Sequence, residues 1–412
     1  MRIAMISEHA SPLAAKGGLG GADGGGQNVF VAELAAELGR QGHCVTVYTR
    51  RDAPALPRRV RLAPHVTVEH VPAGPPENVP KDDLLPWMGD FGRYLRDRWR
   101  TEPPDVAHAH FWMSGLAALR AVDTAAGDRA ERRLVPVVQT YHALGTVKRR
   151  HQGATDTSPA GRVRLERAIG RRVDAIIATC SDEVGELTAM GVSGERVSVV
   201  PCGVDLGLFG PGGPDGAAGA DSRHRLVVLS RLVERKGVDT AIRSLALLPE
   251  AELAIAGGPP RDELDADPEI RRLRRVAADA GVADRVDFVG RVARTDVAPL
   301  LRSASLVLTL PWYEPFGMVP LEAMACGVPI VAAAVGGHLD TVVHGDTGLL
   351  VPPRDPDAAA KAIRELLDDP MRRATMGIAS ADRARVRYSW ARIAAETAAV
   401  YRRAAELCEV PA

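Results

Sequence analysis

Two short segments in the second half of the chain carry charged side chains at spacings suited to a diphosphate and to sugar hydroxyls. Arg231 and Lys236 stand five residues apart, after an apolar run and before a helix. Arg supplies planar donors and Lys a compact charge, so the pair can reach a diphosphate from two sides. Glu314 and Glu322 stand eight residues apart, the first in a loop and the second in the first turn of a helix. Glu322 could bind both hydroxyls of a ribose, and Glu314 could reach a sugar hydroxyl.

The residues between the two glutamates add backbone donors. The amides of Gly317, Met318 and Val319 lie at a helix N-terminus, where free N–H groups and the helix dipole favour a phosphate. Each motif taken alone has a plainer interpretation. The segment with Arg231 and Lys236 could be a solvated basic turn, and Glu322 could be a carboxylate that only complements the helix dipole. Finding both motifs in one domain favours the donor-binding interpretation.

A glycine-rich segment, 17–26, separates the first predicted strand from the first helix and ends next to Gln27. Glycine allows close backbone approach, and a helix N-terminus attracts anions, so a phosphate or sugar contact is favoured over a plain flexible loop. The segment does not match a dinucleotide fingerprint, because Asp23 stands where the third glycine is needed. This mismatch argues against an NAD enzyme.

The motifs sit in a regular alternation of apolar strands and helices, which predicts parallel sheets covered on both faces. The expected strands cover 3–7, 44–48, 106–108, 135–140, 175–179, 197–200, 226–230, 253–256, 286–289, 306–309 and 330–333. The expected helices cover 27–41, a stretch from 114, 159–172, 181–191, 238–247, 268–280, 296–303, 319–325, 356–367 and 390–407.

This rhythm is interrupted at 203–221, a glycine-rich stretch that we predict to be a flexible linker and a hinge. The fold class expected is therefore α/β, with two doubly wound Rossmann-like domains facing a cleft. The predicted domains are an acceptor-binding domain at 1–205, a nucleotide-sugar-binding domain at 206–389, and a C-terminal helix at 390–412 that packs back toward the first domain.

Composition narrows the class of protein. The 412 residues hold 52 basic and 52 acidic side chains, a balance that argues against a nucleic-acid binder or a polybasic membrane clamp. No apolar run approaches the roughly 20 residues that span a bilayer. The five cysteines form no C-x-x-C pair, so neither a disulfide framework nor a zinc site is expected, and a cytoplasmic location fits.

Taken together, the motifs resemble those of retaining glycosyltransferases with the two-domain GT-B fold, in glycosyltransferase family 4. The resemblance covers almost the whole chain, and the first domain is most similar to sucrose-phosphate synthases and inositol phosphate N-acetylglucosaminyltransferases. It rests on E-P-F-G-x-x-x-x-E at 314–322, S-R-L-x-x-x-K-G at 230–237, H-A-H at 108–110, G-G-Q-N-V at 25–29, Y-T-R-R-D at 48–52, T-x-H-x-L-x-x-V-K at 140–148 and A-C-G-V-P-I-V at 325–331.

The resemblance implies roles for named residues. Its donor-binding set is Gly26, Arg231, Lys236, Arg291, Glu314, Gly317, Met318, Val319 and Glu322, with Arg291 near the base and Gly26 near the phosphate. Its catalytic set is His142, Arg231, Lys236 and Glu314, in which His142 faces the reacting sugar and the two cations stabilise the leaving nucleotide. From the residues alone, a structural role explains His142, His108 and His110 better than a functional one.

The same resemblance implies chemistry without a cofactor or metal, because Arg and Lys replace the divalent cation. No D-x-D stands in a plausible loop; Asp265 to Asp267 lies in an acidic surface stretch before a helix. Transfer would retain the anomeric configuration. The leaving phosphate would take the acceptor's proton, so no protein general base is needed.

Acceptor binding is implied for Gln27, Lys81 and Arg162, the last two as cations that hold a phosphate. Phe111 and Ala143 depart from the cyclitol enzymes, where a Tyr and a Thr hydroxyl are expected. An unphosphorylated polyol, sugar or natural-product acceptor therefore stays open. The basic cluster 148–151 could add to the acceptor site or could simply be a solvated turn.

Other classes remain as alternatives. They are a sugar-nucleotide epimerase, a phosphorylase-like enzyme with a pyridoxal phosphate lysine, a non-catalytic sugar-nucleotide binder, and a glycosyltransferase acting on a lipid or polysaccharide. The lipid alternative needs an exposed amphipathic surface, for which the helix at 83–100 is the candidate, although core packing explains its spacing better. The expected partners are a nucleotide-sugar donor and a small acceptor, without nucleic acid or membrane contact, and a homodimer is left open.

Overall fold

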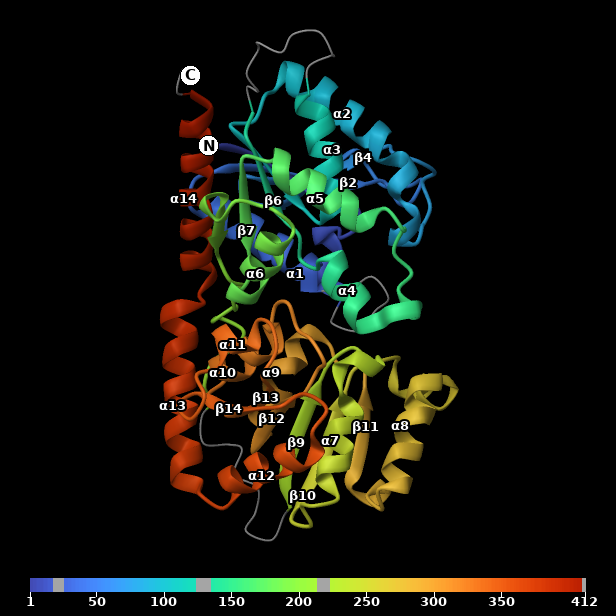
Figure 1. Ribbon diagram of the computed structural model, residues 1–412, viewed down its shortest axis with the longest axis vertical. Coiled ribbons are helices and arrows are strands. Elements are labelled where there is room, and N and C mark those ends of the chain that lie inside the picture. Colours follow the sequence, from blue (N-terminus) through green and yellow to red (C-terminus); the bar gives the residue numbers. More distant parts are fainter. Residues whose placement is uncertain (18–25, 124–134, 213–222, 410–412) are drawn as a thin grey trace. The chain divides into compact units, whose positions relative to one another are not determined.

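A computed structural model describes residues 1–17, 26–123, 135–212 and 223–409. The chain divides into two compact units (Figure 1). Unit 1 comprises Met1–Ala15, Gln27–Pro201 and Trp390–Ala412, and unit 2 comprises Lys16–Gly26 and Cys202–Ser389. Both are α/β units built on largely parallel sheets, as the alternating pattern predicts.

In unit 1, the described residues form an eight-stranded sheet in the order β3-β4-β2-β1-β5-β6-β7-β8. Its strands are β1 (Arg2–Ile6), β2 (Cys44–Arg50), β3 (Arg59–Ala63), β4 (Val66–Val71), β5 (Val106–His110), β6 (Val137–Thr140), β7 (Ala175–Ala178) and β8 (Val197–Val199). All pairs are parallel except β3 with β4. Strand β5 is buried along its whole length, as a strand covered on both faces must be.

The helices of unit 1 cover both faces of this sheet (Figure 1). Helices α2, α3 and α5 pack together on one face, and α1 and α14 share the other. The helices are α1 (Gly26–Arg40), α2 (Met88–Thr101), α3 (Trp112–Val122), α4 (Gly145–Gln152), α5 (Arg162–Arg172), α6 (Ser181–Ala189) and α14 (Trp390–Glu409), with short 3₁₀ turns between them.

In unit 2, the described residues form a six-stranded parallel sheet in the order β11-β10-β9-β12-β13-β14. Its strands are β9 (His224–Leu229), β10 (Ala251–Ala256), β11 (Val286–Gly290), β12 (Leu306–Thr309), β13 (Ile330–Ala333) and β14 (Gly348–Val351). The order reverses between β9 and β12. In doubly wound folds, this switch point is where the loops after the strands diverge and a ligand can enter.

The helices of unit 2 again form two layers (Figure 1). Helices α7, α8 and α12 enclose an aliphatic core with the strands, and α9, α10 and α13 pack together. The helices are α7 (Val238–Leu245), α8 (Pro268–Asp279), α9 (Arg294–Arg302), α10 (Met318–Ala325), α11 (His338–Thr341), α12 (Pro356–Leu367) and α13 (Pro370–Arg387).

The prediction of a flexible linker at 203–221 is wrong for the first part of that range. Cys202, Val204 and Phe209 are all buried in unit 2, and Val204 forms an isolated bridge with Ser389. These apolar side chains anchor the segment despite its glycines, because burying them outweighs the flexibility of the neighbouring residues. The rest of the stretch, from residue 213, lies outside the described residues.

The amphipathic segment at 83–100 packs into unit 1. Leu84, Met88, Phe91, Leu95 and Trp99 are buried, most of them on the face of α2 that contacts α3. The apolar stripe therefore belongs to the core and offers no exposed surface for a lipid. Among the described helices, none is both long and apolar enough to cross a membrane.

Candidate functional site

Three loops of unit 2 meet at the carboxyl ends of adjacent strands β9, β12 and β13. The loop after β9 carries Arg231 and Lys236, and the loop after β12 carries Glu314. The Trp312 N–H donates to the carbonyl oxygen of Arg235 at 2.9 Å, which joins these two loops. The Gly337 N–H donates to the Glu314 carbonyl at 2.8 Å, which joins the third.

Gly237 shows why these loops can lie so close. Its φ is +64°, in the left-handed region, and a Cβ there would overlap the carbonyl oxygen of Leu310. Only glycine meets both conditions without strain. The predicted S-R-L-x-x-x-K-G motif therefore ends in a residue whose backbone sets the spacing of the loops.

Lys236 and Glu314 form an ion pair between the first two loops. Their side chains are 17% and 13% exposed, so the pair is largely shielded from water. Burial favours the neutral form of Glu314, but the charges of Lys236 and His338 overcome it and lower its pKa to about 2. Burial lowers the pKa of Lys236, and Glu314 opposes this shift. Glu314 is therefore a carboxylate at neutral pH.

Two more cations lie beside this pair. Arg231 is exposed, and Arg235 is partly buried. Burial, reinforced by the charge of Arg231, lowers the pKa of Arg235. Three adjacent positive groups repel one another, and a bound anion would relieve this repulsion.

Helix α10 begins at this edge of the sheet. Gly317 precedes it with a φ of +69°, and the amides of Met318 and Val319 open the first turn. Close to Gly317 lies buried His338, whose Nδ1 is 2.9 Å from the Ala333 carbonyl oxygen. Since the nearest acceptor is a carbonyl, Nδ1 carries the proton, and burial lowers the pKa of the ring.

Glu322 lies on α10 and is only 2% exposed. It forms an ion pair with Arg294, the first residue of α9, which the sequence motifs did not single out. Burial raises the pKa of Glu322, and Arg294 counteracts the rise. Arg291, expected near the base, is exposed at the end of β11, where its N–H donates to the Pro259 carbonyl at 2.9 Å.

Unit 1 also gathers its predicted residues at the carboxyl ends of adjacent strands, here β1, β5 and β6. His142 follows β6 with a φ of +61°, an uncommon conformation outside glycine. Its Nε2 lies 2.9 Å from Nδ1 of His110, and both rings are buried. Burial, and in each case the neighbouring His108, lowers the pKa of both rings well below the ordinary value. His142 is therefore a neutral imidazole at neutral pH.

The remaining histidine of the H-A-H motif faces the C-terminal helix. Nδ1 of His108 lies 2.6 Å from the Tyr401 hydroxyl, and Nε2 lies 2.9 Å from the Thr140 hydroxyl. Both ring nitrogens are thus engaged, and burial lowers the pKa of His108 to about 3. His108 is a structural residue that ties α14 to the sheet.

Phe111 brings together the two predicted acceptor cations. Its ring lies 6.0 Å from Nζ of Lys81 and 5.0 Å from the guanidinium carbon of Arg162. The His9 ring meets it edge-on at 4.9 Å, and Nδ1 of His9 is 2.8 Å from a carboxylate oxygen of Glu8. The position where a tyrosine was expected is thus an aromatic platform between two cations.

Arg162 is almost fully buried, and its three nitrogens have separate partners. Nε donates to Glu166 at 2.7 Å, Nη1 donates to Ser158 at 3.1 Å, and Nη2 donates to the Ala143 carbonyl. Since a guanidinium has five N–H groups, these three bonds leave donors available on Nη1 and Nη2. Arg162 can thus both hold the loop and contact an anion.

Gln27, near the start of α1, is the last acceptor candidate. Its Nε2 donates to the Ser7 hydroxyl at 3.2 Å and to the His110 carbonyl at 3.4 Å. These bonds hold the amide against the ends of β1 and β5. Gly26 is the first residue of α1, and the rest of the glycine-rich segment, 18–25, lies outside the described residues.

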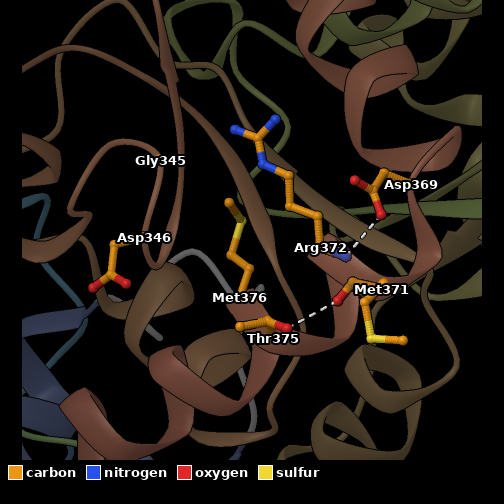
Figure 2. Close-up of a pocket in the computed structure, with 7 residues that line it drawn as sticks. All are labelled: Gly345, Asp346, Asp369, Met371, Arg372, Thr375 and Met376. Carbon is orange, nitrogen blue, oxygen red and sulfur yellow. Dashed lines mark hydrogen bonds between the residues drawn. The ribbon is translucent and has the colours of Figure 1, made fainter.

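A separate pocket lies at the start of α13 (Figure 2). It is lined by Gly345, Asp346, Asp369, Met371, Arg372, Thr375 and Met376. Asp369 caps the helix by accepting from the Arg372 N–H, so its carboxylate already has a structural task. None of the seven is a predicted site residue, and the pocket is distinct from the loops described above.

The comparisons with known proteins agree with this architecture. A model described as Glycosyl transferases group 1 matches residues 218–383, and one described as Glycosyltransferase Family 4 matches residues 24–208. A D-inositol 3-phosphate glycosyltransferase of Catenulispora acidiphila is 38% identical over 98% of this chain and 96% of its own length. One from Kribbella flavida is 38% identical over the same shares of the two chains.

Solved structures show the same fold. Sucrose-phosphate synthase from Thermosynechococcus elongatus has a TM-score of 0.86 and 31% identity over 98% of both chains. The Anabaena protein HepE, solved with UDP and glucose, has a TM-score of 0.73 and 21% identity over the whole of both chains. This protein is therefore a glycosyltransferase with the GT-B fold. It belongs to glycosyltransferase family 4, as the motif resemblance predicted.

Proposed function

We propose that this glycosyltransferase moves a hexosyl group from a UDP-sugar to a small acceptor that carries a phosphate, such as a sugar phosphate or a cyclitol phosphate. The observation that carries the proposal is the placement of Lys81 and Arg162 around one ring, that of Phe111. Two cations at one spot suit a phosphate better than a neutral sugar. The names of the inositol 3-phosphate glycosyltransferases and of sucrose-phosphate synthase support an acceptor of this class.

The donor half rests on unit 2. Arg231 and Lys236 would hold the diphosphate, with Arg235 adding charge behind them, and the first amides of α10 would bind a phosphate oxygen. Glu314, kept ionised beside Lys236, would accept from a hydroxyl of the donor sugar. Glu322 would accept hydrogen bonds from the ribose hydroxyls of the donor.

The reaction itself needs few protein groups. The bond from the sugar's anomeric carbon to the donor phosphate breaks, and a bond from that carbon to the acceptor oxygen forms on the same face. The acceptor's proton passes to the leaving phosphate oxygen. Arg231 and Lys236 stabilise the charge that builds on that phosphate, which is the task of a metal ion in other enzymes. His142, a neutral imidazole, would orient the sugar without transferring a proton.

One assay tests each part. The protein is incubated with UDP-, ADP- and GDP-sugars and with acceptors that differ only in a phosphate, and the product's anomeric configuration is read by NMR. We expect retention, full activity with a chelator, and a KM about tenfold or more lower for the phosphorylated acceptor, since charge-assisted bonds contribute roughly 1.5–3 kcal/mol each.

Different results would overturn different parts. An inverted linkage rejects the retaining mechanism, and activity that a chelator abolishes and Mg²⁺ restores rejects metal independence. Equal KM values for the acceptors with and without phosphate reject the proposed phosphate contact. Isomerisation of the donor alone would indicate an epimerase, and binding without turnover would indicate a sugar-nucleotide binder.

A further inference from the structure

The buried carboxylate of Glu322 is satisfied on one side only. Its Oε1 accepts from Nη1 of Arg294, whereas Oε2 has no hydrogen-bond partner among the residues that the structure describes. A buried carboxylate oxygen left without a donor is costly, and such groups are rare in native proteins. An orphan acceptor of this kind, on a residue only 2% exposed, can accept a hydrogen bond from a ligand that supplies the missing donor.

Arg294 is itself held in place from the other side. Its guanidinium carbon lies 4.7 Å from the ring centre of Phe209, and that ring is completely buried. A cation over the face of an aromatic ring is attracted to it, so Phe209 restrains the position of the guanidinium that faces Glu322. Arg294 thus contacts Phe209 on one side and Glu322 on the other, which links the start of unit 2 to helix α10.

The charge of Arg294 also affects whether Glu322 accepts or donates a hydrogen bond. An ionised carboxylate accepts only, whereas a protonated one also donates. Burial favours protonation of Glu322, and the adjacent Arg294 charge opposes it. Arg294 therefore favours the ionised form, in which the orphan oxygen accepts a hydrogen bond, as from a hydroxyl group.

From this geometry we propose that Arg294 is a positioning residue that turns Glu322 toward the ribose of the donor nucleotide and so makes the enzyme select ribonucleotides over deoxyribonucleotides. The proposal rests on the donor site proposed above and adds the residue that orients it. Arg294 acts through Glu322 and need not touch the nucleotide.

The test compares UDP with 2′-deoxy-UDP and 3′-deoxy-UDP by titration calorimetry. For the wild type, we expect at least one deoxynucleotide to bind about 10- to 100-fold more weakly than UDP, the effect of losing a hydrogen bond to a charged group. In Arg294→Leu this ratio should fall below about threefold, because UDP binding weakens while deoxynucleotide binding changes little. Arg294→Lys restores the charge and should recover part of the ratio.

Arg274→Leu is the matched control. Arg274 also pairs with a carboxylate, Asp265, and also stacks on a phenylalanine, Phe288, at 5.8 Å, but it lies on α8 and apart from α10. It should leave the ratio unchanged. Thermal unfolding of each variant shows whether the fold is retained.

The outcomes separate the two proposals. If the wild type binds neither UDP nor another nucleoside diphosphate, the proposed function fails. If it binds UDP but the ratio is near one, or if Arg294→Leu keeps the wild-type ratio, the positioning role of Arg294 is overturned and the proposed function stands.

Discussion

Arg162 with Glu166 in unit 1 and Arg294 with Glu322 in unit 2 are both ion pairs with a buried carboxylate, but they differ in how far the protein satisfies that carboxylate. Both oxygens of Glu166 lie within hydrogen-bond reach of the Gly145 N–H, at 3.1 and 2.8 Å, and Oε1 also accepts from Arg162. Glu322 has one oxygen paired and one left over. The carboxylate of Glu166 is satisfied without a ligand, which suits a structural role for that carboxylate. One oxygen of Glu322 is left for a ligand, as proposed above.

The largest effect should come from breaking the complete pair. Glu166→Ala leaves Arg162 buried without its partner, and we expect the free energy of unfolding to fall by about 3–5 kcal/mol. Glu322→Ala should cost less, about 1–2 kcal/mol, because Arg294 is 18% exposed and can be hydrated. Urea denaturation measures both. Equal losses would contradict the distinction between the pairs.

The loops after β9 and β12, which we propose to bind the donor, provide the next test. Lys236→Ala removes the cation that faces Glu314 and should lower kcat by about 100- to 1,000-fold, a loss of about 2.7–4 kcal/mol in transition-state stabilisation. Lys361→Ala removes an exposed lysine of α12 in the same unit and should leave kcat unchanged. Steady-state kinetics with saturating acceptor measure the difference. A comparable loss in both variants would place Lys236 outside the site.

A third buried carboxylate sharpens the comparison, because Glu183 has no cation partner within the described chain. One of its oxygens accepts from the Thr179 N–H at 2.8 Å, and burial raises its pKa to about 7. The folded state thus keeps a proton that the unfolded chain releases above its ordinary pKa. Stability from Glu183 is complete below the unfolded pKa and is lost as the pH rises through about 7.

Glu183→Gln cannot titrate, so it should remove this loss. We expect the variant to match the wild type near about pH 5 and to be more stable by about 2–4 kcal/mol near about pH 8. Denaturation at both pH values measures the gap, and Glu195→Gln, an exposed position, is the control. A gap that does not change with pH would refute the titration of Glu183.

The smallest effect concerns the acceptor. Lys81→Ala removes one of the two cations at Phe111 and should raise KM for a phosphorylated acceptor about tenfold, with no change for the same acceptor lacking phosphate. Arg162→Ala cannot give such a clean result, because it also breaks the pair with Glu166. A rise in KM for both acceptors would argue against a phosphate contact.

Sequence patterns predicted the elements whose signals are local. Strands β12 and β13 match the prediction to the residue, since each is a short buried apolar run. The antiparallel pair of β3 with β4 was not predicted. β3 is a partly exposed edge strand whose arginines and small apolar residues give a weak pattern. Helix α4, with two buried residues in a basic segment, was missed for the same reason.

For the site, the motifs located the loops but not their internal partners. The alignment of Glu314 with Lys236 follows from adjacent strands, so the spacing of the motifs could suggest it. The pairing of Arg294 with Glu322 depends on how α9 packs against α10, which no local pattern encodes. Likewise, no residue pattern near His142 predicts its positive backbone φ.

The assignment of helix α14 to unit 1 has a consequence for how the protein is made. Trp390 packs on Phe30, and Tyr401 contacts His108, so the last helix completes a unit whose sheet begins at the first residues. During translation, the second unit emerges whole while the first still lacks a helix. The nascent first unit must therefore stay incomplete until α14 has been synthesised and has left the ribosome.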